Sequence, residues 1–559
     1  MTKGFALMEK STAPGGLFVR QASGLVRDVS MANALFFNIA AFVGTAVGWA
    51  VVFYALFPEW QGLGISAYAW MAILTGIACY FLGLIFSSLT TAMPRSGGDY
   101  VFTSRIISPF WGWIESWTLV GSALTIIGFE IIVAIHNVQL TGILLGVAFP
   151  GSWFSGATGW FSTSATQIIA GIVIMLVILG VSILRTRTFH KVVTALTIFA
   201  IISVAISFFG AFTIGNNSMN AALGSLGTSY NSIVSAATKG GWSAGTPNFS
   251  FLGVIALAGL ASVILFQFIG FQFSSYIAGE VKGNVRRTVF VAVIGALLFA
   301  VFMNSLYIDV LGNHFGFTLT NAWGYLYWNN LHAPLNGQPP FTPLMATAVH
   351  PGAWPLWLIV ALGNVTLNVL LCPVYAIFLS RIVLAWALDR QVPEWFSVVN
   401  ERTNAPLRVI VIAILLGAIF YVLTFFGLNL ASTTFFGVLL AALTWIMPGL
   451  NAILIPYRRP DLFQLTNNTK KFLGLPRLVW YGIIWLIFIV PVYLAAFVYP
   501  VGQQLFGGGS GFLTFASSTG VSWAVGLVLV GIIIYFVMKA INNANGINTR
   551  MMFHELPPD

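Results

Sequence analysis

Two glycines and a hydroxyl residue interrupt the first long apolar segment of the chain. Glycine costs a helix about 1 kcal/mol relative to alanine, so the stretch is a weak point in a helix. Inside hydrocarbon, a break is tolerated only where protein or a polar cavity satisfies the freed backbone groups. The stretch therefore predicts a ligand-binding break, although its glycines also have the spacing of a helix-packing face. Its residues are Gly44, Thr45, Ala46, Val47 and Gly48.

A second stretch of this kind lies in the sixth apolar segment, where Gly270 is flanked by polar and aromatic side chains. Two broken helices at corresponding positions of two five-helix halves are typical of transporters built from inverted repeats. The phenylalanines are candidates for gates or cation–π partners, or else they only pack or face lipid. Together with the first break, the predicted substrate-binding residues here are Phe266, Ile269, Gly270 and Phe271.

The amino-acid composition indicates that these segments lie in a lipid bilayer rather than in water. Of the 559 residues, 58% are hydrophobic and only 7% are charged, and the mean hydropathy is +0.91. Soluble domains carry about 25% charged residues, so the chain is an all-α polytopic protein of the lipid bilayer. We expect no nucleic-acid partner, no metal site, no cofactor and no enzyme activity, because neither a metal-ligand cluster nor a catalytic constellation is visible.

The apolar runs predict about twelve membrane-spanning helices. With the N-terminus inside, Lys239 is the only basic residue outside, and the other 23 of the 24 lie in cytoplasmic segments or tails. This asymmetry predicts a multi-pass protein of the plasma membrane with both termini cytoplasmic. The expected spans are 31–57, 67–93, 110–140, 165–184, 192–215, 251–278, 289–311, 355–388, 408–428, 431–457, 478–499 and 521–541.

Short motifs near the ends of these spans carry a family resemblance. They are residues 38–39 (NI) with 44–47 (GTAV), 93–100 (MPRSGGDY) with 104–105 (SR), 276–282 (YIAGEVK) with 286–288 (RRT), 379–381 (LSR), 387–390 (ALDR), 393–396 (PEWF) and 404–406 (NAP). In combination they resemble the amino acid–polyamine–organocation (APC) superfamily of secondary transporters. The resemblance covers most of the first ten spans.

The resemblance implies a five-plus-five inverted repeat with discontinuous helices 1 and 6. The two repeats would cover about 31–215 and 251–457, within a transport core of 31–457. Helices 11 and 12 would follow at 458–541, between cytoplasmic tails at 1–30 and 542–559. The implied function is secondary active transport of amino acids or related small amines by alternating access. An exchanger or uniporter without ion coupling, or a non-transporting nutrient sensor, remains an alternative, and the oligomeric state stays open.

The physics of the two breaks agrees with an amino acid as the substrate. A half-helix that starts after the first break offers free N–H groups and a dipole that favour a carboxylate. Unwound carbonyls of both breaks can accept hydrogen bonds from an ammonium group. Relatives usually carry Gly-x-Gly at the first break, whereas Ala46 occupies the second glycine position here, which widens the choice to other small amines. On the third span, Ala123 leaves room for the substrate.

Coupling and gating candidates come from polar residues inside the spans. A carboxylate inside the membrane is energetically costly, so its presence indicates a function. For Glu115, which lies nearer the cytoplasm, a structural hydrogen bond or an ion pair of the inner gate is the alternative. Proton-coupled relatives often hold a lysine at the position of Thr197, so H⁺ and Na⁺ both remain possible coupling ions. Asp99 and Glu280 are candidates for pairing with loop arginines. The coupling or gating candidates are Glu115, Glu130, Thr197, Asn368 and Tyr375. For Asn368 and Tyr375, ordinary hydrogen bonds between helices are the alternative.

Overall fold

The computed structural model describes residues 24–42, 50–57, 60–243, 251–329, 331–428, 430–495 and 518–547, with positions 553, 555 and 556 near the C-terminus. The predicted first break lies outside the described residues, so the structure is silent on five expected site residues. These are Gly44, Thr45, Ala46, Val47 and Gly48.

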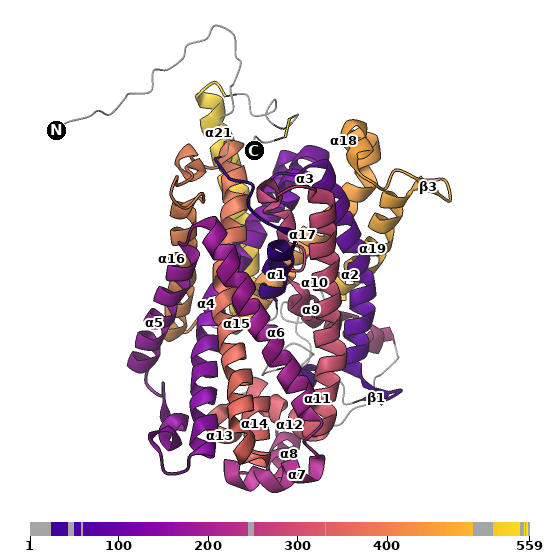
Figure 1. Cartoon of the computed structure of the whole chain (residues 1–559). Helices are drawn as coiled ribbons and strands as arrows, with labels where there is room; N and C mark the ends of the chain where they lie inside the picture. Colours follow the sequence, from indigo (N-terminus) through magenta and orange to yellow (C-terminus); the bar gives the residue numbers. More distant parts are fainter. Residues whose placement is uncertain are drawn as a thin grey trace, which may run out of the picture.

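Long helices that run side by side form the body of the molecule (Figure 1). Eight segments are long and apolar enough to cross a membrane, judged by length and composition of the described residues. The helices of this bundle are α1 (Met31–Ala40), α2 (Ala67–Ala92), α4 (Pro109–Ala148), α5 (Ser164–Ser182), α6 (Thr186–Ala211), α9 (Phe251–Phe268), α10 (Val285–Phe302), α15 (Trp354–Leu388), α16 (Leu407–Leu423), α17 (Leu430–Arg458), α19 (Arg477–Tyr493) and α21 (Ser518–Ala544).

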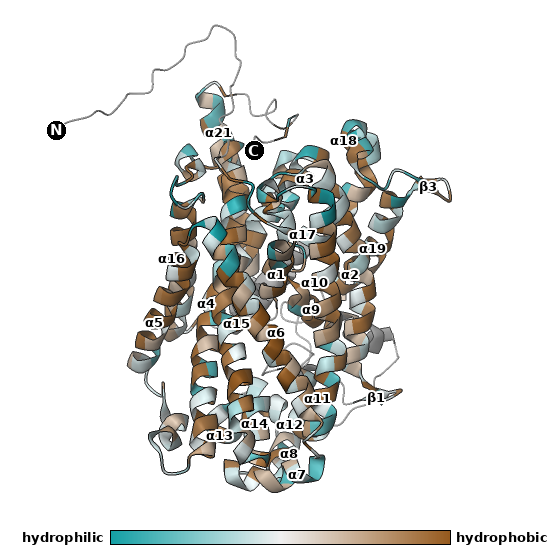
Figure 2. Ribbon diagram, viewed as in Figure 1, coloured by the Kyte–Doolittle hydropathy of each residue, from teal (hydrophilic) through white to brown (hydrophobic). Residues whose placement is uncertain are grey.

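The central helices are α4 and α15. In the most apolar 18 residues of each helix, 83% of the positions of α4 and 94% of those of α15 are buried. The corresponding fractions are 11% for α5 and 17% for α21. The peripheral helices expose large apolar side chains such as Ile169, Leu176 and Ile533. Figure 2 shows that hydrophobic residues dominate the length of the bundle and hydrophilic ones gather toward its ends. The burial pattern is that of a protein surrounded by lipid rather than water.

One end of the bundle carries short elements between the long helices (Figure 1). We call it the basic end, because the stretches that hold Arg95, Arg105, Arg390 and Arg459 lie there. Its elements are α3 (Asp99–Ile106), η6 (Ala278–Glu280), η9 (Glu394–Ser397), α18 (Pro460–Leu465) and the antiparallel hairpin of β3 (Lys471–Phe472) and β4 (Leu475–Pro476).

A helical cap forms the opposite end (Figure 1). The described parts of residues 216–250 and 312–354 belong to this end, and Lys239 is the one formally charged residue of these two stretches. They form helices that are held together by polar contacts: Trp242 Nε1 donates to Asn321 Oδ1, and the Tyr325 hydroxyl donates to the Gly240 carbonyl. The cap consists of η2 (Ala50–Leu56), β1 (Gln61–Gly62), β2 (Ile65–Ser66), η3 (Trp153–Gly159), α7 (Asn216–Ala222), η4 (Leu223–Leu226), α8 (Tyr230–Lys239), α11 (Ile308–Phe315), α12 (Phe317–Trp328), α13 (Pro334–Gly337), α14 (Thr342–Val349) and η8 (Pro351–Ala353).

Several helix ends differ from the sequence expectation. The helix expected at 110–140 continues to Ala148, and the Gln139 side chain within it donates to the carbonyls of Ala157 and Trp160 in the cap. The seventh span continues from α10 through a π-helical turn, η7 (Met303–Tyr307), into α11. Within the span expected over 31–57, for which a break was predicted, α1 ends at Ala40 and helical structure is next described at η2.

Candidate functional site

The helix of the sixth span is interrupted in the interior of the bundle. Helix α9 ends at Phe268, and Gly270 has φ +108°, a backbone conformation that side chains other than glycine rarely adopt. A Cβ atom at Gly270 would lie 2.3 Å from the Cβ of Ala41, the residue at the end of α1. The interruption predicted at Gly270 is therefore present, and it lies directly against the place where the first helix ends.

A single side chain of α1 holds the unwound segment. Asn38 Nδ2 donates to the Phe271 carbonyl at 2.6 Å, and Asn38 Oδ1 accepts from the backbone N–H of Ser274 at 2.6 Å. The chain before α1 is also paired to the chain after the break, because Val29 N–H donates to the Glu280 carbonyl at 2.9 Å. Helix α1 and residues 269–282 thus form one connected unit. The sequence motif included Asn38, but its role in holding the break was not predicted.

The predicted residues around the break are buried. Phe266, Ile269 and Phe271 expose 9%, 4% and 0% of their surface, so a lipid-facing position for these phenylalanines is wrong. Two polar atoms of the same segment, Gln272 Oε1 and Ser275 Oγ, are buried without a hydrogen-bond partner among the described residues. Such groups are available to a polar ligand. Gln272 and Ser275 were not among the predicted substrate-binding residues, although polar residues in the middle of an apolar span are typical of a binding site.

Glu130 lies between the two central helices. Its Oε2 accepts from Asn368 Nδ2 of α15 at 2.7 Å, and Asn368 Oδ1 accepts from Asn137 Nδ2 at 2.7 Å. The other carboxylate oxygen, Oε1, is buried and has no partner in the described part of the chain. Ala123, seven residues before Glu130 on α4, is also fully buried. Two coupling candidates, Glu130 and Asn368, are therefore in direct contact.

An aromatic cluster lies between the break and the basic end. Phe273 stacks on Phe378 with ring centroids 4.0 Å apart, and Tyr276 and Tyr375 meet Phe378 edge-on at 5.3 and 5.5 Å. We call these four residues the aromatic cluster. The candidate gating residue Tyr375 thus belongs to a packed layer of rings that joins the unwound segment to α15.

Two buried ion pairs lie beyond the aromatic cluster. Glu280 accepts from Arg381 Nε at 2.7 Å and from its Nη2 at 2.9 Å, and neither side chain exposes more than 1% of its surface. Asp389 pairs in the same bidentate way with Arg105 and also accepts from the Tyr100 hydroxyl at 2.9 Å. Glu280 therefore pairs with an arginine, but Arg381 lies within helix α15 and not in a loop as expected. Bidentate arginine–carboxylate pairs of this kind are strong and geometrically specific.

The expectation of an arginine partner for Asp99 is wrong. Asp99 Oδ2 accepts from the Tyr276 hydroxyl at 2.8 Å, and Oδ1 accepts from the N–H of Tyr100. Burial raises the pKa of Asp99 to about 7, and the hydrogen bond from Tyr276 offsets part of that effect. Glu115 interacts with the Asp99 carboxyl, and both Glu115 oxygens are buried without a well-aligned donor. Glu115 therefore belongs to the basic end, away from the break.

Thr197 has an ordinary structural environment. It is fully buried on α6, and its hydroxyl donates to the Val193 carbonyl of its own helix at 2.7 Å. Such a bond satisfies the hydroxyl without any ligand. The burial of the Thr197 hydroxyl is therefore explained by a hydrogen bond within its own helix, without a coupling ion.

Comparisons with known proteins agree with this arrangement. The profile of the amino acid permease family matches residues 35–515. The chain is also similar to the glutamate/serine transporter AimA of Bacillus subtilis (strain 168), with 24% identity over 286 residues, which cover 50% of this chain and 48% of that protein. This match therefore extends over about half the length of the relative. Because the family profile covers most of the sequence, from α1 to beyond α19, the chain belongs to the amino acid permease family of the APC superfamily.

Proposed function

We propose that this protein is a secondary active transporter that moves amino acids or related small amines across the plasma membrane by alternating access. Membership of the amino acid permease family supports transport as the function. The observation that carries the proposal is the interruption of the sixth-span helix after Phe268, buried against the end of α1. A break of this kind places free backbone groups near the middle of the bundle, where a transporter needs a binding site.

The proposal includes a fold of twelve spans arranged as two inverted repeats of five, followed by two further helices, with both termini cytoplasmic. Eight described segments are long and apolar enough to cross a membrane. Helices α9 and α17 and the shorter apolar helices α1 and α19 would supply the other four spans. The interruption at Gly270 lies five spans after the end of α1, as expected for corresponding helices of two repeats.

A substrate with an uncharged side chain fits the site best. The sequence holds no charged residue between Asn38 and Gly48 or between Phe266 and Ser275. The ammonium and carboxylate groups of an amino acid can be matched by backbone carbonyls and N–H groups. A charged side chain would remain without a counter-ion in a buried site, which is costly. The relative is named for glutamate and serine, and we propose that serine-like substrates are preferred here.

The aromatic cluster and the two buried ion pairs act as the gate on the basic end. They connect the unwound segment, α15 and α3 through Phe273–Phe378, Glu280–Arg381 and Arg105–Asp389 contacts. Opening this end requires these contacts to separate. In this proposal, the arrangement in which these contacts are intact is the one closed toward the basic end.

We propose Glu130 as the carrier of a coupling proton. A carboxylate that accepts one hydrogen bond from Asn368, and has an unpartnered oxygen in a buried position, is expensive to charge. In the described part of the chain, the titratable groups that interact with it are Cys372 and Tyr375 of α15, and neither supplies a positive charge. Protonation removes the charge, and release of the proton would favour a different arrangement of α4 and α15.

Ligand binding tests the substrate proposal. Purified protein is heated with serine, glutamate, other amino acids, polyamines and nucleobases, with and without sodium, at pH 5 and pH 7. A ligand that binds the native state raises its Tm. We expect the largest rise with a small neutral α-amino acid. A rise only with polyamines or nucleobases would show that the proposed substrate class is wrong.

Uptake into proteoliposomes tests transport and coupling together. With Glu130→Gln, we expect exchange of labelled for unlabelled substrate to persist and accumulation driven by a proton gradient to disappear. Glu401→Gln, at an exposed loop carboxylate, is the matched control and should accumulate substrate as the natural protein does. Accumulation driven by sodium alone would contradict the proton assignment. Binding without either uptake or exchange would identify a sensor instead of a transporter.

A further inference from the structure

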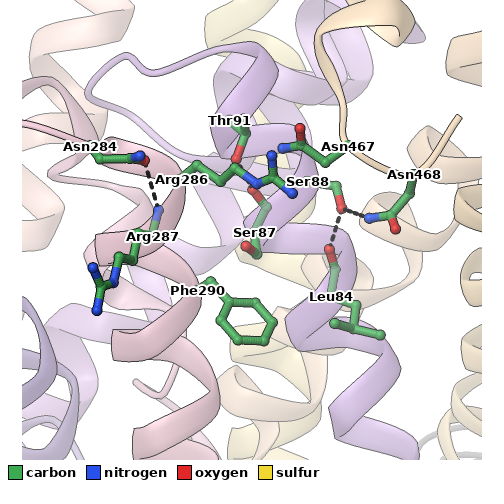
Figure 3. Close-up of a pocket in the computed structure, with 10 residues that line it drawn as sticks. All are labelled: Leu84, Ser87, Ser88, Thr91, Asn284, Arg286, Arg287, Phe290, Asn467 and Asn468. Atoms are coloured by element: carbon green, nitrogen blue, oxygen red, sulfur yellow. Dashed lines mark hydrogen bonds between the residues drawn. The ribbon is translucent and has the colours of Figure 1, made fainter.

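An open pocket lies at the basic end, remote from the break. It has a volume of about 430 Å³ and is lined by the last turns of α2, the first turns of α10 and the segment after α18 (Figure 3). Among the ten residues that line it, two are arginines and none is acidic. They are Leu84, Ser87, Ser88, Thr91, Asn284, Arg286, Arg287, Phe290, Asn467 and Asn468.

The two arginines are not used by the protein itself. Neither the Arg286 nor the Arg287 guanidinium forms an ion pair or hydrogen bond with any residue that the structure describes. Lys282, the next basic residue upstream, instead pairs with Asp28. Figure 3 shows the Arg286 side chain extending across the pocket toward Thr91 and Asn467, whereas the Arg287 guanidinium points away from Arg286 at the edge of the pocket. Among the residues that the structure describes, the guanidinium groups of this pocket therefore have no counter-ion.

Other groups of the pocket are arranged for an anion with several oxygen atoms. Helix α10 begins here, and its N-cap Asn284 accepts from the N–H of Arg287, which leaves earlier N–H groups of the first turn free. A helix of 18 residues adds a favourable dipole for an anion at this position. Ser88 is already engaged, because it accepts from Asn468 Nδ2 at 2.6 Å and donates to the Leu84 carbonyl. These bonds fix the wall without using the arginines.

We propose that this pocket binds the phosphate group of an anionic phospholipid in the membrane leaflet at the basic end. Guanidinium groups match phosphate oxygens in a bidentate geometry, and basic pockets between membrane helices are typical binding sites for anionic head groups. Phe290 follows Arg286 by one helical turn toward the middle of the bundle and exposes 41% of its surface. The pocket thus has a charged part at the helix ends and an apolar part toward the bilayer, as a phospholipid requires.

Lipid retention tests this proposal without any transport assay. The protein is purified in mild detergent from membranes that contain phosphatidylglycerol, and the bound lipid is counted by native mass spectrometry. We expect Arg286→Gln/Arg287→Gln to weaken binding of phosphatidylglycerol about fivefold for each arginine removed. Arg185→Gln/Arg187→Gln removes two exposed arginines near the start of α6 and is the matched control. The control should retain lipid as the natural protein does.

A second measurement separates a lipid from a soluble phosphate. Inorganic phosphate is added in a thermal-shift assay of delipidated natural protein and of the Arg286→Gln/Arg287→Gln variant, in parallel with phosphatidylglycerol. A rise in Tm with phosphatidylglycerol that the variant lacks supports the proposal. Stabilisation of the natural protein by inorganic phosphate alone would show that a soluble phosphate compound is the ligand and overturn it. Equal loss of lipid in both arginine variants would overturn it as well, because the attraction would then be unspecific.

Discussion

At the scale of single residues, the position of Gly270 allows a sharp prediction. Gly270→Ala would place a methyl group 2.3 Å from the Cβ of Ala41 in a backbone conformation unsuited to alanine. We expect a loss of roughly 2–5 kcal/mol in the free energy of unfolding, from strain and overpacking together. The measurement is Tm in detergent, with and without substrate, and the rise caused by substrate should vanish.

The control for this variant is Gly180→Ala. Gly180 lies in α5, and a Cβ atom there meets nothing within 4 Å. This substitution should leave substrate binding intact and stabilise the helix by up to about 1 kcal/mol. If Gly270→Ala were as stable as Gly180→Ala and still bound substrate, the close packing of the break against α1 would have no functional role.

Asp99 predicts a specific dependence of stability on pH. Its pKa is raised by burial from 3.8 to about 7, so the folded protein binds a proton more tightly than the unfolded chain. Stability therefore falls as the pH rises between those two values and levels off above about pH 7. Asp99→Asn should remove this contribution, so its Tm should change less than that of the natural protein between pH 5 and pH 7.5. Parallel curves for the two proteins would show that Asp99 does not titrate in this range.

At the scale of elements, the segment after the break and α15 are linked through Glu280 and Arg381. Glu280→Gln leaves the Arg381 guanidinium buried without a counter-charge, and we expect a loss of about 3–5 kcal/mol in the free energy of unfolding. The double variant Glu280→Gln/Arg381→Gln removes both charges and should be more stable than the single variant. Chemical unfolding in detergent measures both. A double variant at least as unstable as the sum of the two single variants would contradict a direct pair.

The polar contacts between α4 and α15 follow the length of both helices. Trp386 Nε1 donates to Ser116 Oγ at 2.8 Å near the basic end, and Asn368 contacts Glu130 and Asn137 further along. Buried polar contacts at several levels oppose sliding of one helix past the other, because each displacement would leave unpaired groups behind. These contacts therefore couple α4 to α15, and the Glu130–Asn368 bond is the one that a change in the protonation of Glu130 would disturb.

At the scale of the whole molecule, the distribution of charge predicts its orientation. Lys239 ends α8 in the cap, at the opposite end from α3 and α18 (Figure 1). In intact cells, a Lys239→Cys variant should react with a membrane-impermeant maleimide, whereas Arg187→Cys should react only after permeabilisation. The natural protein is the control, because Cys79 and Cys372 are both buried. The reverse labelling pattern would place the termini outside the cell.

Features encoded in short stretches of sequence could be predicted, and pairings between distant stretches could not. The interruption near Gly270 followed from glycine and polar residues inside an apolar run. The partner of Glu280 is 101 residues away and that of Asp99 is 177 residues away, so the choice between arginine and tyrosine depended on packing. The extension of α4 to Ala148 was missed as well, and Gln139 within it is satisfied by carbonyls of a separate segment. Sequence alone also left the lining of the basic-end pocket undetected.

The two buried ion pairs make the stability of the contacts at the basic end depend on temperature. Hydration of charged groups becomes less favourable as temperature rises, so removing four charges from water costs less in the warm. Packing of the aromatic cluster gains comparatively little over the same range. Glu280–Arg381 and Arg105–Asp389 therefore hold the basic end more firmly in warm conditions than in cold ones.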